Sequence, residues 1–315
     1  MNEKIYNYLH LIFVSFIYLN VIYIKCFENK YYYFFKDYFC INNNEIINNY
    51  LLNEKQFLKE LYIFSQEETI EEIIKNNKSI SRYGDGEFSL IFGDDIHFQK
   101  KNKNLSKRLN EILKSNEKDL LIGLPNPINI NFLINFTEFS KNAWLKFIEQ
   151  NKFKLVKLFD KNRKYYSSFI SRFYFDFKNK SNVPAYMKKL KKLWDNKNVV
   201  LIEGEKSKLG IGNDLFDNMK SIKRIICPSD NAFNIYDKIL NETLKIKKNN
   251  LILLALGPTA TVLAFDLYKN GYHVIDIGHI DTEYEWFLRN ATTKINIDKN
   301  KIINENETIK FIYEY

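Results

Sequence analysis

The stretch Ser79-Ile-Ser-Arg-Tyr-Gly-Asp-Gly-Glu-Phe88 reads as a short strand that runs into a tight turn and the start of a helix. Gly84 and Gly86 let the backbone turn sharply and hold the carboxylates of Asp85 and Glu87 one residue apart. Carboxylates this close repel each other unless a cation lies beside them. We therefore expect either a divalent metal ion at this pair or an ordinary acidic turn that caps the next helix.

Arg82 lies three residues before Asp85 and offers a second positive partner for the acidic pair. Its guanidinium can also bind a phosphate group through two parallel hydrogen bonds. A hard cation such as Mg²⁺ takes one or two protein carboxylates and completes its shell with substrate phosphates. The stretch thus favours a ligand that contains phosphate at the end of the predicted strand.

The composition is that of a globular protein, with 315 residues of which 45% are hydrophobic and 27% charged. The three cysteines lack the spacing of a metal site, and reduced thiols favour a cytoplasmic location. The net charge of +9 comes mainly from lysines spread along the chain, without the basic stripe interleaved with aromatic residues that marks a nucleic-acid groove. We expect no nucleic-acid partner; a membrane surface or a phosphorylated substrate fits the charge.

Residues 1–45 form a hydrophobic and aromatic extension, and residues 46–315 form the domain that we expect to carry the function. Residues 5–24 have no formal charge and the length of a membrane span. Polar side chains interrupt this run, so a spanning anchor, an interfacial helix and a helix packed on the domain all stay open. In the first two cases the protein would associate with the inner face of the cell membrane.

Apolar runs of strand length alternate with helical patterns from residue 65 onward, and Ser65 with Glu68 forms a capping box at the first of these helices. The expected strands are 80–83, 120–124, 168–175, 199–202, 225–227, 251–256 and 273–277. The expected helices after them include 138–158, 184–195, one from 213, and 231–244. This alternation predicts an α/β fold with a largely parallel sheet and helices on both faces.

Right-handed crossovers would bring every loop between a strand and its helix to one edge of this sheet. Ligands of open α/β sheets bind at that edge, outside the carboxyl ends of the strands. The edge would collect the acidic turn, Asn126, loop 203–212, Ser229, residues 257–259 and residues 279–283. The residues with chemical potential therefore fall where a ligand is expected.

The sequence Gly257-Pro258-Thr259 joins a buried strand to a helix. Free amides and the helix dipole favour an anion there, Thr259 can add a hydroxyl donor, and Gly257 lets a ligand approach the backbone. A plain helix that begins with proline explains the same residues. Loop 203–213 could wrap a nucleotide, although it lacks the spacing of the known glycine-rich phosphate motifs.

His279, Asp281 and Glu283 form a polar cluster just after the last predicted strand. A histidine with carboxylates can supply a general base or bind a sugar hydroxyl. Alternatively, Asp281 caps the helix and Glu283 compensates the helix dipole. These residue types leave the choice open.

Several stretches, in their order and spacing, resemble the bacterial glycosyltransferases with the GT-D fold. They are Ser81-Arg-Tyr-Gly-Asp-Gly-Glu87, Ser171-Arg-Phe-Tyr174, Glu203-Gly-Glu-Lys-Ser-Lys-Leu-Gly-Ile-Gly-Asn-Asp-Leu-Phe216, Leu256-Gly-Pro-Thr-Ala-Thr-Val-Leu263 and Asp276-Ile-Gly-His-Ile-Asp-Thr-Glu-Tyr-Glu-Trp286. The resemblance implies a Rossmann-like transferase that uses a nucleotide-sugar donor. The Asp-x-Glu motif of the family falls on Asp85 and Glu87 and is associated with a metal ion and the donor diphosphate.

On this basis we expect a metal-assisted hexosyltransferase in which Asp85 and Glu87 hold Mn²⁺ or Mg²⁺. The donor, with a UDP-sugar favoured, would be bound by Arg82, Gly84, Arg172, Glu203, Gly212, Asn213, Gly257, Pro258 and Thr259. Asp281 or Glu283 would accept the proton of the acceptor hydroxyl, with His279 as a contact or competing base. The acceptor would be a glycan, a glycoprotein or a lipid-linked glycan.

Two alternatives use the same residues differently. A nucleotide-dependent phosphotransferase would act on nucleoside triphosphates and ignore sugar nucleotides. A non-catalytic sugar-binding scaffold at the membrane would use the acidic turn only as a helix cap and would show no metal-linked nucleotide binding.

Overall fold

The computed structural model of the protein describes residues 56–297 and 308–312. These residues build a nine-stranded sheet with the order β1-β4-β3-β2-β8-β7-β5-β6-β9, and all its strand pairs are parallel. The α/β prediction is therefore confirmed. The predicted N-terminal extension, including residues 5–24, lies outside the described residues, and none of the helices within them is long and apolar enough to cross a membrane.

The central strands are short apolar runs buried on both faces, as a parallel sheet requires, whereas the outer strands are partly exposed. They are β1 (Tyr62–Ile63), β2 (Ser79–Arg82), β3 (Leu120–Leu124), β4 (Lys164–Ser167), β5 (Asn198–Gly204), β6 (Ser221–Cys227), β7 (Leu251–Ala255), β8 (His273–Asp276) and β9 (Thr308–Phe311). The α-helices are α4 (Gln66–Asn76), α5 (Asp85–Ile91), α6 (Lys103–Lys114), α7 (Glu138–Leu158), α8 (Val183–Lys191), α9 (Tyr236–Thr243), α10 (Pro258–Lys269) and α11 (Ile280–Leu288).

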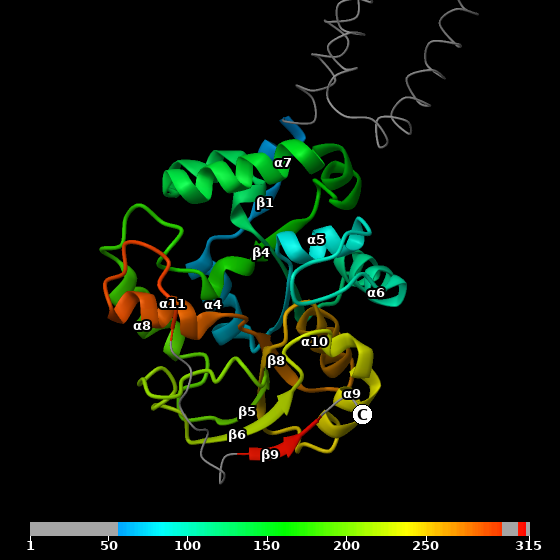
Figure 1. Cartoon of the computed structure of the whole chain (residues 1–315), viewed down its shortest axis with the longest axis vertical. Helices are drawn as coiled ribbons and strands as arrows, with labels where there is room; N and C mark the ends of the chain where they lie inside the picture. The colour runs from blue at the N-terminus through cyan, green and yellow to red at the C-terminus, as the bar shows by residue number, and fades with distance from the viewer. Residues whose placement is uncertain (1–55, 298–307, 313–315) are drawn as a thin grey trace, which may run out of the picture. The chain divides into compact units, whose positions relative to one another are not determined.

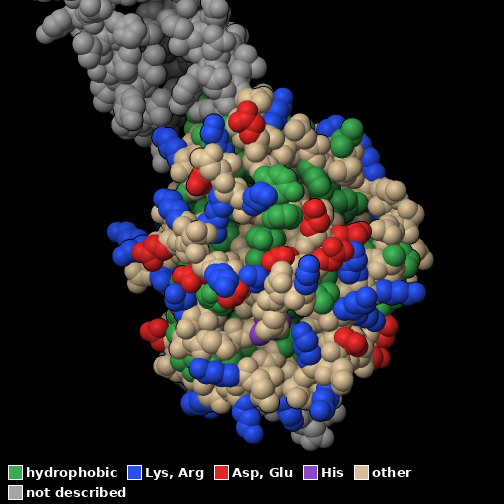
Figure 2. Space-filling model, turned by 180° about the vertical axis from the view of Figure 1, so that it is seen from behind, with side chains coloured by type: hydrophobic (Ala, Val, Ile, Leu, Met, Phe, Trp, Pro, Cys, Tyr) green, Lys and Arg blue, Asp and Glu red, His purple; other side chains and the backbone are tan. Residues whose placement is uncertain are grey.

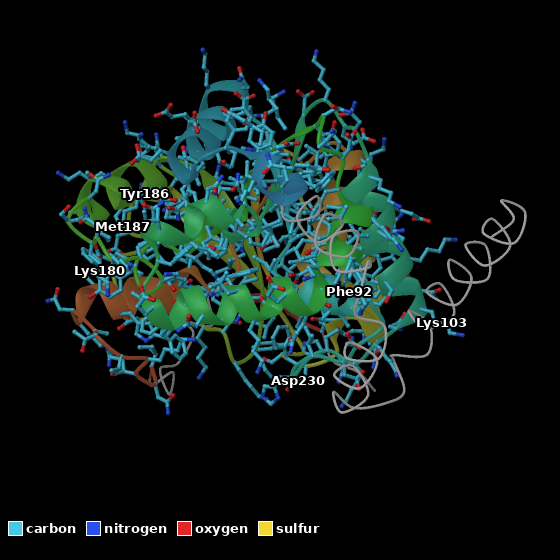
Figure 3. All side chains as sticks on the ribbon, turned by 90° about the horizontal axis from the view of Figure 1, so that it is seen from above. Phe92, Lys103, Lys180, Tyr186, Met187 and Asp230 are labelled. Atoms are coloured by element: carbon cyan, nitrogen blue, oxygen red, sulfur yellow. The ribbon has the colours of Figure 1, made fainter. Side chains whose placement is uncertain are left out.

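The helices cover the sheet on two sides (Figure 1). Helices α4, α8 and α11 bury their apolar side chains with one face, and α5, α6, α7, α9 and α10 do so with the other. Figure 3 shows the same division from above, with Tyr186 and Met187 of α8 on the side opposite Phe92 and Lys103. The basic side chains on the face in Figure 2 are dispersed among acidic ones, as the even spread of lysines in the sequence predicts.

Two expected elements are wrong. A strand was expected at 168–175, but the strand in this part of the chain is β4, which ends at Ser167. Residues Ser168–Ser171 form a 3-10 helix instead. The Ser167 side chain accepts a hydrogen bond from the Phe169 N–H and so turns the chain out of the sheet. No α-helix begins at 213, because residues 205–220 cross from β5 to β6 through turns.

The topology creates a crevice at the carboxyl edge of the sheet. Strands β2 and β8 are neighbours, with Ile80 opposite Ile275, yet the chain leaves β2 for α5 on one face and leaves β8 for α11 on the other. Strands β7 and β5 diverge in the same way, toward α10 and toward loop 205–220. Adjacent strands whose connections diverge leave room between them, and ligands of open α/β sheets bind there.

Candidate functional site

The acidic turn forms the first turn of α5 at the carboxyl end of β2. Gly84 is the N-cap residue, and its N–H donates a hydrogen bond of 2.6 Å to Oε2 of Glu87. Glu87 is therefore the third residue of the helix and caps it from within. Asp85 takes no part in this cap, and its side chain is exposed at the edge of the sheet. Glu87 thus stabilises the start of the helix, whereas Asp85 does not.

The surroundings of Glu87 are short of positive charge. Burial, together with the neighbouring carboxylates of Asp276 and Asp85, raises the pKa of Glu87 to about 7, although the hydrogen bond from Gly84 acts in the opposite direction. A divalent cation between Asp85 and Glu87 would relieve this repulsion, so the donor set fits a hard metal ion. The described part of the chain holds no group of three His, Cys, Asp or Glu side chains placed to bind a metal, so ligand oxygens would have to complete the shell.

Arg82 is placed differently from its predicted role as a phosphate contact. Its Nη1 donates to Ser168 O and to Ser171 Oγ, both at 2.6 Å, and its Nη2 forms an ion pair of 3.0 Å with the buried Asp276. Both Nη groups are engaged within the protein. Arg82 therefore ties the ends of β2 and β8 to the 3-10 helix after β4, and we assign it a positioning role.

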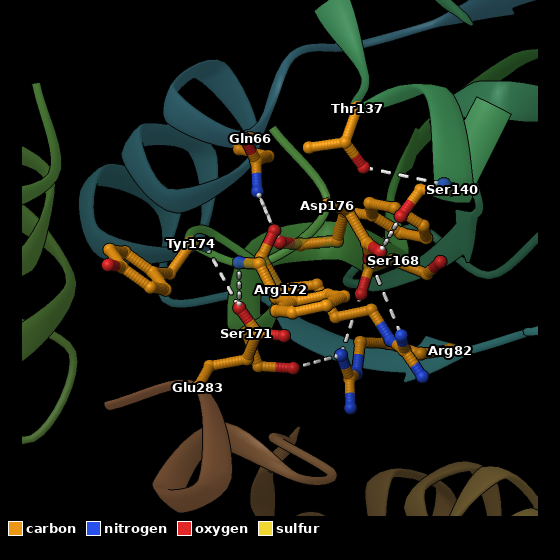
Figure 4. Close-up of polar contacts among 12 residues, drawn as sticks. Gln66, Arg82, Thr137, Ser140, Ser168, Ser171, Arg172, Tyr174, Asp176 and Glu283 are labelled. Atoms are coloured by element: carbon orange, nitrogen blue, oxygen red, sulfur yellow. Dashed lines mark hydrogen bonds and ion pairs between the residues drawn. The ribbon is translucent and has the colours of Figure 1, made fainter. Parts of the chain in front are cut away.

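Arg172 is the arginine that reaches the open edge. Its side chain is half exposed and lies 3.5 Å from Asp176, and Asp85 and Glu283 also lie within electrostatic range. Figure 4 shows the backbone beside it: Gln66 donates to the Arg172 carbonyl at 2.8 Å, and Glu283 accepts from the N–H groups of Tyr174 and Phe175. The loop that carries Arg172 is thus fixed from both sides.

The carboxylates predicted as general bases are both buried. Glu283 accepts the two backbone hydrogen bonds at 2.9 and 3.0 Å, and Asp281 accepts from Gly210 N–H at 2.8 Å and from Asn213 Nδ2 at 2.9 Å. They hold the loops that surround the edge, and this geometry argues against a catalytic base at either position. The alternative prediction that Asp281 caps the helix is also wrong, because His279 occupies the N-cap position of α11.

Loop 203–213 is anchored by buried charges beneath it. Glu203 is fully buried, pairs with Arg224 at 2.5 Å and accepts a hydrogen bond from Leu209 N–H. Asn213 points its amide at Asp281 and Glu285. Both residues were predicted to line a nucleotide pocket, but in the structure their side chains form hydrogen bonds that hold the loop in place. Gly212 is exposed with a φ of +81°, which glycine adopts readily.

A cavity of about 220 Å³ lies at the carboxyl ends of β5, β7 and β8. Its lining combines backbone from three strand ends with small polar and a few charged side chains. The lining residues are Phe98, Gly204, Lys206, Ser207, Leu209, Ser229, Ala255, Leu256, Gly257, Gly278, His279 and Thr282. We call this the strand-end cavity. Gly278 lies directly against Arg82, so the cavity adjoins the acidic turn through the β2–β8 contact.

Gly257 is the member of the Gly-Pro-Thr motif that reaches the cavity. Its φ of +52° and ψ of −140° suit glycine alone, and a Cβ there would come within 2.6 Å of the Phe98 ring. Pro258 and Thr259 begin α10 and are buried, and the Thr259 hydroxyl has no hydrogen-bond partner within the described chain. The predicted anion contact thus rests on Gly257 and the start of the helix.

Sequence reasoning found His279, which is exposed and lines the cavity, but missed Phe98 and Thr282. Phe98 comes from a loop far from the other lining residues in the chain, and its carbonyl accepts a hydrogen bond from Asn231 N–H. The signal available in the sequence was a phenylalanine within a polar stretch.

Comparisons with known proteins place this geometry in a family. The family model described as glycosyltransferase GT-D fold matches residues 80–306. A solved structure titled as the domain of unknown function 1792 with a distinct glycosyltransferase fold is 36% identical, with a TM-score of 0.78 over 84% of this chain and 99% of that one. Another, titled a new glycosyltransferase from Streptococcus sanguinis, is 37% identical, with a TM-score of 0.72 over 78% of this chain and 91% of that one.

Two curated relatives come from streptococci. Glycosyltransferase GlyD of Streptococcus pneumoniae serotype 4 is 37% identical over 78% of this chain, and the probable glycosyl transferase Gly of Streptococcus gordonii is 38% identical over 79%. The aligned regions cover 30% and 36% of those two proteins, so the chain spans about a third of their length. The match of the family model over most of the sheet, together with these relatives, shows that the chain belongs to the family of glycosyltransferases with the GT-D fold.

Proposed function

We propose that this domain is a metal-assisted glycosyltransferase that moves a sugar from a nucleotide-sugar donor, with a UDP-sugar favoured, to a glycan acceptor in surface polysaccharide or glycoprotein biosynthesis. One observation carries the proposal: an acidic turn with an exposed carboxylate ends β2, and the neighbouring strand β8 leads into the lining of the strand-end cavity, at the point where the strand connections diverge. The family supports the reaction class.

Asp85 and Glu87 would hold the metal ion, which when bound neutralises the negative charge of the leaving diphosphate. Arg172, half exposed and within electrostatic range of Asp85, would add positive charge on the same side. Gly257 allows the diphosphate to approach the start of α10, where backbone N–H groups and the helix dipole favour an anion. The strand-end cavity would receive the nucleotide.

His279 is the better candidate for contact with the reacting hydroxyls. It is exposed at the cavity, whereas Asp281 and Glu283 are buried beneath hydrogen-bonded loops. Histidine is the side chain most often used to accept a proton near neutral pH. Association with the inner face of the membrane through residues 5–24 remains part of the proposal.

Turnover tests this function most simply. Release of nucleoside diphosphate would be followed for a panel of nucleotide sugars with Mn²⁺, and ATP and GTP would be offered in parallel reactions. We expect one class of nucleotide sugar to be consumed and the Asp85→Asn variant to lose that activity. The Asp237→Asn variant is the matched control, because Asp237 is an exposed acid on α9 outside the cavity lining.

Consumption of nucleoside triphosphates alone would overturn the proposal in favour of a phosphotransferase. Folded protein with no turnover and no nucleotide binding would instead support the sugar-binding scaffold.

A further inference from the structure

A second cavity, larger than the first, lies on the same edge of the sheet. Its volume is about 380 Å³, and it lies between the start of α4, the start of α8 and the loops that follow β3 and β4. The lining residues are Ser65, Gln66, Glu67, Glu68, Glu71, Phe132, Phe173, Phe177, Asn179, Asn182, Val183 and Tyr186. We call it the α4–α8 cavity. All these segments follow strand ends, so it opens on the edge that carries the acidic turn.

Aromatic rings form much of its wall. Phe173 and Tyr186 lie with ring centroids 5.7 Å apart, and Phe132 and Phe177 form an edge-to-face pair at 6.5 Å. Tyr186 is fixed by a 2.7 Å hydrogen bond from its hydroxyl to the Ile170 carbonyl. Aromatic rings beside hydrogen-bonding side chains occur in sites for small organic ligands.

The three carboxylates of this lining have partners within the protein, but they keep a net negative charge because a single lysine pairs with two of them. Lys189 pairs with Glu67 at 2.9 Å and with Glu71 at 2.7 Å, and Glu68 is engaged by Ser65 in the capping box of α4. Lining carboxylates would repel a phosphate or an acidic ligand, and a cationic ligand would have to displace Lys189. The site therefore favours a neutral ligand.

Two side-chain amides of the lining have groups that could form hydrogen bonds with the hydroxyls of a ligand. Within the described chain, Gln66 uses its Nε2 for Phe169 O and Arg172 O but makes no hydrogen bond through its Oε1. Asn179 accepts from Ser181 through Oδ1 and makes no hydrogen bond through its Nδ2. An acceptor and a donor beside aromatic rings match a neutral sugar, which has both hydroxyls and apolar C–H faces.

The chain itself connects this cavity to the acidic turn. Phe173 lines the cavity, and the preceding residue, Arg172, lies within electrostatic range of Asp85. Gln66 at the cavity donates a hydrogen bond to the Arg172 carbonyl, and Glu283 accepts hydrogen bonds from the N–H groups of Tyr174 and Phe175 (Figure 4). A ligand seated in the cavity would thus extend toward the turn where the donor sugar is expected.

We propose that the α4–α8 cavity binds a neutral oligosaccharide as the acceptor of the transfer. This inference rests on the proposed function, which supplies the donor on the adjoining part of the edge. It assigns Phe177 and Asn179 to acceptor binding.

An array of immobilised oligosaccharides tests the assignment with the full chain. Neutral oligosaccharides would be printed beside uronic-acid oligosaccharides and a lysine-rich peptide. We expect binding to one or more neutral glycans and a weakening of about five- to ten-fold in the Phe177→Ala and Asn179→Ala variants, as the loss of a stacking contact or hydrogen bond predicts. Phe153→Ala is the matched control, since Phe153 is 42% exposed on α7 and lines neither cavity.

Absence of neutral-glycan binding, binding only to the acidic glycans or the peptide, or equal binding by wild type and both variants would overturn the inference. Asn179 is exposed, so Asn179→Ala decides the matter if Phe177→Ala disturbs folding. The melting shift given by a nucleotide sugar with Mn²⁺ would be measured on the same samples. If that shift is missing while glycan binding depends on Asn179, the donor proposal fails and the cavity assignment stands.

Discussion

At the scale of single residues, Asp85 and Glu87 differ in their part in the fold. Glu87 accepts the Gly84 N–H and caps α5, whereas Asp85 is exposed and outside the cap. A change at Asp85 should therefore affect metal and donor binding without a large effect on folding. A change at Glu87 should affect both.

We expect Asp85→Asn to lower the transfer rate by about 10²- to 10⁴-fold, since one charge-stabilising ligand of the metal is lost. Its melting temperature should stay within about a degree of wild type, as expected for an exposed side chain. Steady-state rates and thermal unfolding of the same preparations measure the two effects. A variant that keeps near-wild-type transfer would refute the metal role of Asp85, with Asp237→Asn as the control.

His273 gives a prediction about pH. Burial lowers the pKa of His273 to about 4, with its Nε2 2.9 Å from the Lys78 carbonyl. Because the unfolded chain binds a proton below pH 6.5 and the folded chain does so only near 4, this residue removes stability as the pH falls between these values. The loss over the whole interval is on the order of 3 kcal/mol, for a difference of about 2.5 pKa units at about 1.4 kcal/mol per unit.

Chemical unfolding at pH 7 and pH 4.5 would measure this effect against His273→Gln. The variant should lose less stability than wild type over that interval. An equal loss in both proteins would show that His273 does not contribute.

At the scale of elements, the start of α10 combines an unusual backbone conformation with a crowded neighbour. Gly257 has a φ of +52°, and its missing Cβ would meet the Phe98 ring at 2.6 Å. Gly93 has a φ of +89° with nothing within 4 Å of a built Cβ. A comparison of substitutions at the two glycines thus distinguishes the cost of backbone strain from the cost of a clash with the Phe98 ring.

Gly257→Ala should destabilise the protein by about 2–4 kcal/mol and weaken donor binding, whereas Gly93→Ala should cost only the backbone term of about 1–2 kcal/mol. Denaturant unfolding and nucleotide-sugar binding would be compared for both variants. Equal effects of the two substitutions would contradict the close contact between Phe98 and Gly257.

The buried Glu203–Arg224 pair anchors loop 205–220, which has no helix of its own. Arg224→Met leaves a buried carboxylate without its cation and should destabilise the protein by about 3–5 kcal/mol. The double variant Glu203→Met with Arg224→Met should be less destabilised than Arg224→Met alone. A double-mutant cycle measures this, and a double variant worse than the single one would contradict the argument.

Elements that bury a continuous apolar run could be predicted from the sequence, and those set by local side-chain contacts could not. β3 and β7 are five-residue apolar strands found where the pattern places them. The strand expected at 168–175 failed because its apolar residues are buried through a 3-10 helix and loop. β1 and β9 escaped prediction because two to four residues carry too little periodicity.

The candidate site divides in the same way. The acidic turn was predictable because its glycines and carboxylates are adjacent in sequence. The burial of Arg82 was not, because it depends on Asp276, 194 residues away. Asp281 and Glu283 looked like catalytic groups because their residue types suit catalysis, and only the folded chain reveals the loops that they hold.

At the scale of the whole molecule, one edge of a parallel sheet carries two cavities with an acidic turn between them in strand order. The strand-end cavity lies at β5, β7 and β8, the acidic turn follows β2, and the α4–α8 cavity lies beyond β3 and β4. A transferase needs a donor site and an acceptor site that meet at the reacting atoms. The proposed donor and acceptor sites would both lie on this edge.

The measurement that tests the central claim most directly is the melting temperature of the full chain with UDP-, GDP-, CMP- and dTDP-sugars, in Mn²⁺ and in EDTA. A ligand that binds only the folded state at about 100 times its Kd adds about 2.7 kcal/mol of stability, a shift of several degrees for a domain of this size. The account predicts that one nucleotide class gives this shift, and that EDTA or Asp85→Asn abolishes it. An equal shift in EDTA and in Asp85→Asn, or stabilisation by nucleoside triphosphates alone, would contradict it.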